Sequence, residues 1–168
     1  VEMQSDFLLK KLLHSIFEEI IKGVLSMKAL YFEHFGASEV LQYGELPQPE
    51  IGENDVLVKV EYIGLNFADI YRRRGDYHIE KHTPYINGYE GAGVIKAIGA
   101  NVTNQQVGET VLFVDVPFAN AEYVAVPSEQ AIRLPAGIDS KLAASIGLQG
   151  MTADFLAHDP GKNTTCEK

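Results

Sequence analysis

The 168-residue chain has one cysteine, no tryptophan and no long uninterrupted apolar run. The single cysteine, Cys166, excludes a disulfide framework within the chain and a cysteine-rich metal site. Charged residues such as Lys10, Glu18 and Lys22 interrupt the apolar stretch near the start, so neither a secretory signal nor a membrane span is predicted. The formal net charge of −9 argues against a nucleic-acid or membrane partner. These absences favour a cytoplasmic protein.

Residues 6–25 give the strongest helix signal in the sequence. Eight large apolar residues recur at helical spacing, and polar residues occupy the other side. We expect residues 1–26 to form an amphipathic helical extension, which either docks on its own domain or pairs with a second copy in a homodimer. The apolar stripe consists of Leu9, Leu12, Leu13, Ile16, Phe17, Ile20, Ile21 and Val24.

From Met27 onward the periodicity is that of short strands. Val56, Val58 and Val60 alternate with less apolar neighbours, which predicts a strand at 55–64 with one buried face. Many short strands and few helices predict a mainly β, α+β fold built as a small barrel or curled sheet. Further strands are predicted at 28–32, 40–43, 110–116 and 121–126, and a helical region capped by Asp139-Ser140 runs through Leu156, interrupted at Gly147 and Gly150.

The stretch from 64 to 98 combines a strand end, a short helix and a glycine-rich strand. Asn66 is a natural helix cap, and Gly75 is a natural helix end. Between them, FADIYRRR has helical spacing of its apolar residues. A helix carrying Asn, Asp, Tyr and Arg between two strands predicts one wall of a ligand site.

The segment Gly91-Ala92-Gly93 superficially matches a dinucleotide-binding fingerprint. The residues that follow favour a strand, and the third glycine of the fingerprint would fall on Lys96. The fingerprint needs a helix N-terminus for the pyrophosphate, so we reject it. We expect the small residues to let two backbones approach closely.

Five motifs in one order resemble those of the medium-chain dehydrogenase/reductases, and within them the zinc-independent quinone oxidoreductases related to zeta-crystallin. The resemblance covers residues 27–159 and implies a GroES-like catalytic domain, a partly open β-barrel, followed by a polar tail at 160–168. The motifs are GLNFADIYRRRGDY (64–77), GYEGAGVIKAIGANV (88–102), VGETV (107–111), AEYVAVP (121–127) and LQGMTADFL (148–156).

The resemblance also implies roles for particular residues. Asn66, Asp69 and Tyr71 match positions near the nicotinamide ring and the quinone, and Tyr71 would donate a hydrogen bond to the substrate carbonyl. Gln149 and Thr152, with Asn66 and Tyr71, match positions that contact the cofactor. From the residues alone, Asn66 can equally be only a cap, Tyr71 a core aromatic, and Gln149 and Thr152 helix-packing residues.

The resemblance further predicts a site without metal. Asn66 replaces the family's zinc-binding cysteine and Tyr89 replaces its histidine, while a second cysteine is lacking. Of the three consecutive arginines, we expect two to lie in water and one to pair with Asp69 or with a cofactor phosphate. These arginines are Arg72, Arg73 and Arg74.

The implied reaction is hydride transfer from NADPH to a quinone or an activated enone. In the family, a Rossmann domain follows the helix near Gln149, and the remaining residues of this sequence are too few for it. We therefore expect a truncated or isolated catalytic domain that is inactive alone and binds NADPH poorly. The alternatives are a non-catalytic binding or assembly module, and one half of a split reductase that needs a Rossmann partner chain.

Overall fold

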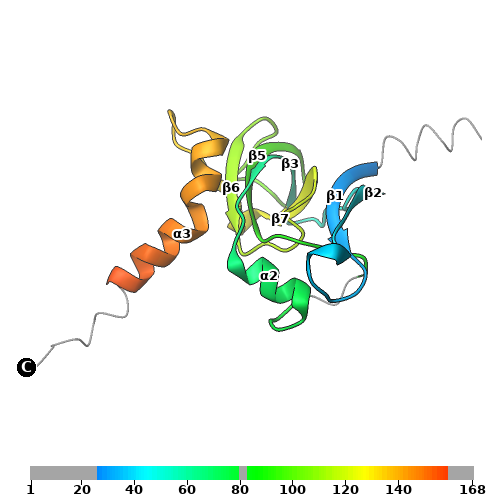
Figure 1. Ribbon diagram of the computed structural model, residues 1–168. Helices are drawn as coiled ribbons and strands as arrows, with labels where there is room; N and C mark the ends of the chain where they lie inside the picture. Colours follow the sequence, from blue (N-terminus) through cyan, green and yellow to red (C-terminus); the bar gives the residue numbers. More distant parts are fainter. Residues whose placement is uncertain (1–25, 80–82, 159–168) are drawn as a thin grey trace, which may run out of the picture.

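The computed structural model describes residues 26–79 and 83–158 (Figure 1). The predicted amphipathic extension and the polar tail lie outside the described residues. Short 3₁₀ turns occur at Ser38–Val40 and Ser128–Gln130. The other elements are β1 (Ser26–Phe32), β2 (Gln42–Pro47), β3 (Asp55–Ile63), α2 (Phe67–Arg74), β4 (Tyr85–Ile86), β5 (Glu90–Ile98), β6 (Thr110–Val114), β7 (Tyr123–Pro127), β8 (Ile132–Arg133) and α3 (Ser140–His158).

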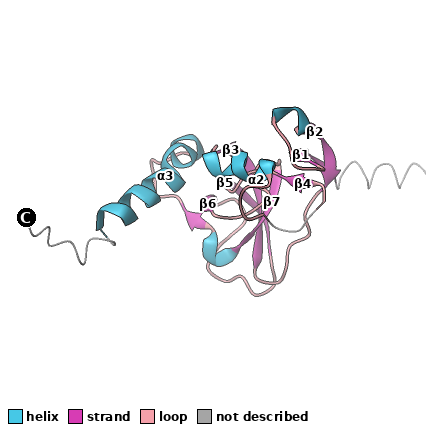
Figure 2. Cartoon of the chain, turned by 60° about the horizontal axis from the view of Figure 1, so that its bottom comes forward, coloured by secondary structure: helices cyan, strands magenta, loops and turns pink. Residues whose placement is uncertain are grey.

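The strands form two antiparallel sheets (Figure 2). One has the order β7-β3-β5-β6-β8, and the other has the order β2-β1-β4. A bridge between Ala29 and Ala121 joins them, and the Leu30 N–H donates to the Asn120 carbonyl at 2.8 Å. The mainly β prediction is confirmed, but neither sheet closes into a barrel within the described residues.

The main core is built from side chains of the five-stranded sheet. Val56 and Val58 of β3 are fully buried, as their alternation predicted, and they pack with Phe113 of β6. The alternation fails at Tyr62, which is exposed. The register between β3 and β5 shifts between Val60 and Tyr62, and such an irregularity re-aims side chains.

The glycine-rich segment is part of strand β5, as predicted. A Cβ on Gly93 would overlap the backbone carbonyl of Lys59 on the neighbouring strand β3. The expectation that a small residue allows two backbones to approach is therefore confirmed at this position. Because a strand and not a helix follows Gly91, rejection of the dinucleotide fingerprint was correct.

Several element predictions were wrong in their limits. The strands predicted at 110–116 and 121–126 are β6, which ends at Val114, and β7, which begins at Tyr123. Residue Val40 lies in a 3₁₀ turn and not in a strand, and the second strand, β2, begins at Gln42. The predicted interruptions at Gly147 and Gly150 are absent, because α3 is one continuous helix. Its cap was predicted correctly, since the Leu142 N–H donates to Asp139 Oδ1 at 2.7 Å.

Only the first half of α3 packs on the sheet. Ala143, Ala144 and Gly147 are buried against β5 and β6. Every residue from Met151 to His158 is exposed. Both views show this second half extending away from the strands (Figures 1 and 2). Within the described residues, no helix is long and apolar enough to cross a membrane.

Candidate functional site

Helix α2 begins and ends as its sequence predicts. Asn66 and Asp69 form a capping box, in which the Asn66 N–H donates to Asp69 Oδ2 at 3.0 Å. Gly75 ends the helix with a φ of 81°, a conformation that glycine adopts without steric cost. The cap fixes Asn66 at the junction between β3 and α2.

Asn66 is also the centre of a network that joins three elements. Its Nδ2 donates to Glu90 Oε2 at 3.0 Å, and its Oδ1 accepts from Gln149 Nε2 at 3.2 Å. Glu90 Oε1 accepts from the Leu148 N–H at 2.6 Å. The carboxyl group of Glu90, which is 0% exposed, therefore ties α2 and α3 to β5.

Two glycines leave the space that the Glu90 side chain occupies. A Cβ on Gly64 would overlap the Glu90 carboxyl group, and a Cβ on Gly147 would lie 2.7 Å from Glu90 Oε1. The Gly147 position would also meet Leu112 at 2.9 Å. Gly147 is therefore a packing residue inside α3 and not a helix end, which explains the wrong prediction there.

Asp69 is buried beside this network, at 4% exposure. Its Oδ1 has no hydrogen-bond partner within the described residues and lies 3.7 Å from Arg72 Nη1. Burial raises the pKa of the Asp69 carboxyl group above its usual value. The Asn66 N–H and Arg72 lower this pKa, and Glu90 raises it further.

The three arginines do not behave as the sequence analysis expected. Arg72 and Arg73 are buried, and only Arg74 is exposed. The guanidinium of Arg72 lies 3.4 Å from the ring centroid of Tyr89, in a cation–π contact, and its Nε donates to the His78 carbonyl at 3.1 Å. The predicted pairing of an arginine with Asp69 is confirmed.

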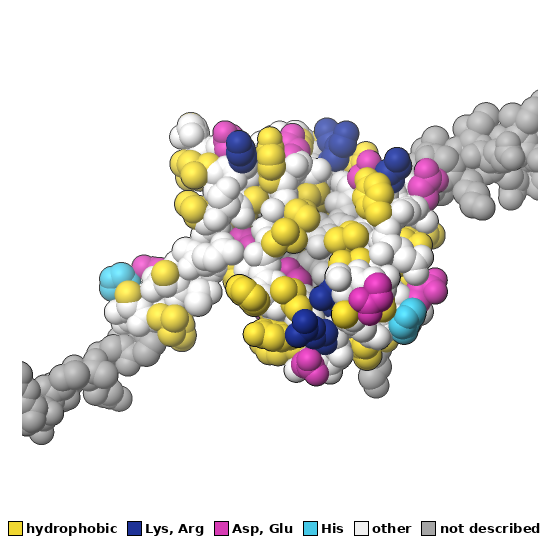
Figure 3. Space-filling model, viewed as in Figure 1, with side chains coloured by type: hydrophobic (Ala, Val, Ile, Leu, Met, Phe, Trp, Pro, Cys, Tyr) yellow, Lys and Arg dark blue, Asp and Glu magenta, His cyan; other side chains and the backbone are white. Residues whose placement is uncertain are grey.

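A pocket of about 440 Å³, here called the Asn66 pocket, opens beside α2. Hydrophobic side chains gather around α2 on this face of the molecule (Figure 3). Among the predicted site residues, Asn66 and Asp69 line this pocket, but Tyr71, Gln149 and Thr152 do not. The lining consists of Leu30, Leu41, Leu65, Asn66, Phe67, Asp69, Ile70, Arg73, Asn87 and Asn120.

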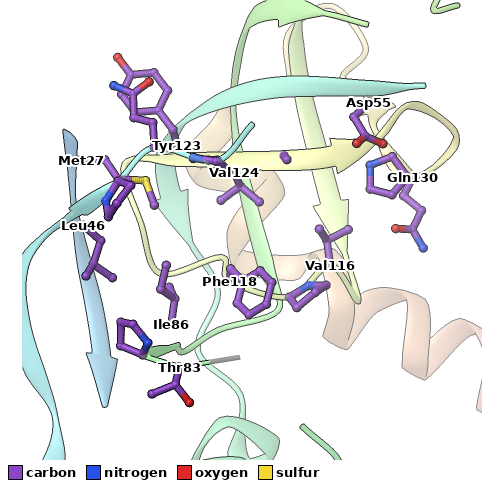
Figure 4. A pocket seen from close by; sticks show the side chains of 17 residues that line it. Met27, Leu46, Asp55, Thr83, Ile86, Val116, Phe118, Tyr123, Val124 and Gln130 are labelled. Carbon is purple, nitrogen blue, oxygen red and sulfur yellow. The ribbon is translucent and has the colours of Figure 1, made fainter. Parts of the chain in front are cut away.

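A larger, mostly apolar pocket of about 570 Å³ lies elsewhere, and we call it the Met27 pocket (Figure 4). Met27, Leu46 and Ile86 line it from the three-stranded sheet, and Phe118 and Val124 line it from the other side. None of the predicted site residues contributes to it. We therefore do not take it, on its size alone, as the candidate functional site.

The structure thus brings together Asn66, Asp69 and Gln149, and leaves two predicted residues apart. Tyr71 is 45% exposed on α2, and Thr152 is exposed on the second half of α3. Sequence reasoning missed the role of Glu90. The sequence did contain a sign of this role, because Glu90 is an acidic residue in a strand of mostly small and apolar residues. A carboxyl group buried in such a strand requires hydrogen-bond partners.

No group of three or more His, Cys, Asp or Glu residues that could hold a metal ion is found in the described ranges 26–79 and 83–158. The arrangement in the site that is most similar to a set of metal ligands is the pair of carboxyl groups of Asp69 and Glu90. These groups interact with amide and guanidinium groups instead. The amide and carboxyl groups that line the Asn66 pocket can form hydrogen bonds with a small molecule.

Comparisons with known proteins match this fold and this part of the chain. The model of the alcohol dehydrogenase GroES-like domain matches residues 52–159. The chain is 38% identical over 130 residues to a quinone oxidoreductase of Pseudomonas aeruginosa, covering 77% of this chain and 40% of that protein. It is 38% identical over 127 residues to a probable quinone oxidoreductase of Schizosaccharomyces pombe, covering 74% and 37%.

Solved structures give the same result. The quinone oxidoreductase of Pseudomonas syringae superposes with a TM-score of 0.77 at 33% identity, over 80% of this chain and 41% of that one. The Escherichia coli quinone oxidoreductase complexed with NADPH superposes with a TM-score of 0.74 at 29% identity, over 79% and 41%. The chain thus spans about two fifths of these relatives. It belongs to the alcohol dehydrogenase GroES-like domain family of the medium-chain dehydrogenase/reductase superfamily.

Proposed function

We propose that this chain provides the substrate-side domain of an NADPH-dependent oxidoreductase that reduces a quinone or an activated enone. The observation that supports it most is the hydrogen bond between Gln149 and Asn66. It joins two residues that the family resemblance predicts on the cofactor side, although they are 83 positions apart in the sequence.

The residues present fit a nicotinamide and a small carbonyl compound. Asn66 is fixed by Glu90 and Gln149 at the edge of a mostly apolar pocket, so its carboxamide is positioned before a ligand arrives. When bound, NADPH would supply the hydride. Tyr71 is half-exposed on the same helix and does not line the pocket. The family resemblance implies that its hydroxyl would donate to the carbonyl oxygen of the substrate.

A nucleotide-binding domain outside these 168 residues completes the proposed enzyme. Phosphate and adenosine contacts supply much of the affinity for a dinucleotide, and the residues around Asn66 do not replace them. We expect the 168-residue chain alone to reduce quinones far more slowly than ordinary enzymes, which turn over at ~1–1000 s⁻¹. A rate in that range for the chain alone would contradict this part of the proposal.

A chimera tests the proposal directly. Residues 27–158 replace the corresponding part of the Pseudomonas aeruginosa relative, and NADPH oxidation is followed with a simple quinone. We expect turnover, and a loss of about 10²-fold or more in kcat/KM for Asn66→Ala and Tyr71→Phe. The control variant Tyr43→Phe alters an exposed tyrosine of β2 and leaves the rate unchanged. A folded chimera without turnover favours the non-catalytic binding module.

A further inference from the structure

The side chain of Asn120 is a buried amide in the segment just before β7. It is 5% exposed, and neither its Nδ2 nor its Oδ1 has a hydrogen-bond partner within the described residues. Its backbone, in contrast, is bonded on both sides: Leu30 donates to its carbonyl, and its N–H donates to the Asn87 carbonyl at 2.8 Å. A buried amide left unpaired destabilises the folded state unless a ligand or water satisfies it.

The local backbone holds this amide in place. The segment before it contains two non-glycine residues in the left-handed region, Asp115 at φ 58° and Phe118 at φ 71°. Such conformations persist only where the surrounding structure enforces them. Gly88, itself at φ 90°, leaves the room that Asn120 needs, because a Cβ there would overlap Asn120 Oδ1.

Asn120 lines the Asn66 pocket, whose other walls are largely apolar. Leu30, Leu65, Phe67 and Ile70 supply much of this surface. An apolar pocket with a few fixed polar groups is the usual form of a small-molecule site. The charged groups that line it, Asp69 and Arg73, have opposite signs, so a neutral ligand is favoured over an ion.

We propose that Asn120 is a binding residue for a neutral, mostly apolar carbonyl compound in the Asn66 pocket, and that its Nδ2–H donates to the carbonyl oxygen. The inference rests on the proposed function for its ligand class, and it adds a specificity-determining residue to that site. Quinones and enones are such compounds, and a matching hydrocarbon would leave the amide unpaired.

A pair of probes tests this on the full chain without any nucleotide. The ¹⁵N-labelled protein is titrated in NMR with 1-indanone, a ketone that does not alkylate thiols, and with indane, its hydrocarbon. We expect indanone to bind about tenfold more tightly than indane and to shift the side-chain amide signals of Asn120. Asn120→Leu should abolish this tenfold preference without weakening indane binding.

Thermal melting separates a binding role from a structural one. Removal of an unpaired buried amide should leave the Tm of Asn120→Leu unchanged or raised, whereas a structural role would lower it. Asn104→Leu, at an exposed asparagine, is the matched control and should retain the preference for the ketone. If Asn120→Leu fails to fold, the ratio of the two affinities in the unaltered chain still tests whether the ketone is preferred over the hydrocarbon.

Three results of the titration would overturn the inference: equal affinities for the two probes, no binding of either, or signal shifts at Lys28 and Tyr43 without shifts at Leu65 and Phe67. Lys28 and Tyr43 line an adjoining hollow that Asn120 also lines, whereas Leu65 and Phe67 line only the Asn66 pocket. Its failure is distinguishable from failure of the proposed function. The titration needs no hydride donor, and an inactive chimera would leave the ketone preference intact. An active chimera without that preference would refute only the role of Asn120.

Discussion

At the scale of single residues, Glu90 determines how the site is held. Its carboxyl group accepts hydrogen bonds from Asn66 and from the Leu148 N–H, while Gly64 and Gly147 leave room for it. One side chain thus fixes the position of both helices relative to β5. A network of this kind is stabilising only while each of its members has a partner.

Replacing Glu90 should therefore be costly. We expect Glu90→Leu to lower the free energy of unfolding by roughly 2–4 kcal/mol, because two half-buried donors lose their acceptor. Glu90→Gln keeps the shape and one acceptor, so it should cost about half as much. Urea unfolding measures both, with the exposed Glu129→Gln as control, expected within about 0.5 kcal/mol of the unaltered protein. Equal stability of all three variants would refute this role.

Asp69 gives the site a pH dependence of defined sign. Burial raises its pKa above the ordinary 3.8, so the folded protein binds this proton more tightly than the unfolded chain does. Stability from this group therefore increases as the pH falls through the folded pKa towards 3.8, and decreases as the pH rises.

Asp69→Asn removes that titration. As the pH is lowered from about 7 to about 4, we expect the free energy of unfolding of the unaltered protein to increase relative to that of Asp69→Asn. Urea unfolding at several pH values measures it. A shift in the opposite direction would mean that Arg72 outweighs burial and that the pKa is lowered.

Sequence reasoning located Asn66 and Asp69 but not their surroundings. A cap residue is recognisable because its partners lie within three positions, as Asn66 and Asp69 do. The partners of Glu90 are 24 and 58 positions away, so only the fold brings them together. The burial of Arg72 was not predicted for the same reason, since Tyr89, which it contacts, comes from the segment just before β5.

At the scale of elements, the pairing of β3 with β5 depends on Gly93. We expect Gly93→Ala to lower the free energy of unfolding by roughly 1–3 kcal/mol, because its Cβ overlaps the Lys59 carbonyl. Gly108→Ala is the matched control. Gly108 has a φ of 95°, and a Cβ added there would meet no atom within 4 Å, so the substitution costs only the conformational strain of about 1 kcal/mol. Equal costs would show that the close approach at Gly93 relaxes readily.

Periodicity predicted the buried strands better than the edge strand. Strand β3 alternates up to Val60 because one of its faces is in the core, and its predicted limits agree with the structure within one residue. Strand β2 is a mostly exposed edge strand, so its sequence had no alternation to detect. The buried Val40 just before it was mistaken for part of the strand.

Helix α3 should show two levels of protection along its length. Its first half is buried on the sheet and its second half is exposed, so the second half should open without global unfolding. We expect amide hydrogen exchange at least ~tenfold faster for residues 151–156 than for residues 143–147. Uniform protection that disappears on dilution would instead show that a second copy of the chain covers the exposed half.

At the scale of the whole molecule, the unexplained feature is the Met27 pocket. Its lining is mostly apolar, and no predicted site residue contributes to it. Large apolar surfaces on soluble proteins are usually covered by another segment of protein or by a ligand. The amphipathic stretch at 6–25, which lies outside the described residues, joins the domain at Ser26, next to Met27 in the pocket wall.

The sequence predicts that this stretch docks on its own domain or pairs with a second copy. Deletion of residues 1–25 leaves β1 whole and should remove the burial of at least one large apolar side chain, at roughly 1.5–3 kcal/mol each. We expect a Tm lowered by about 4 °C or more. Leu12→Ser with Ile16→Ser should have the same effect without shortening the chain, while Lys11→Ser, on the polar side, should not.

Sedimentation distinguishes docking within one chain from a dimer, because only a dimer dissociates on deletion. An unchanged Tm and an unchanged size would refute both forms of the prediction.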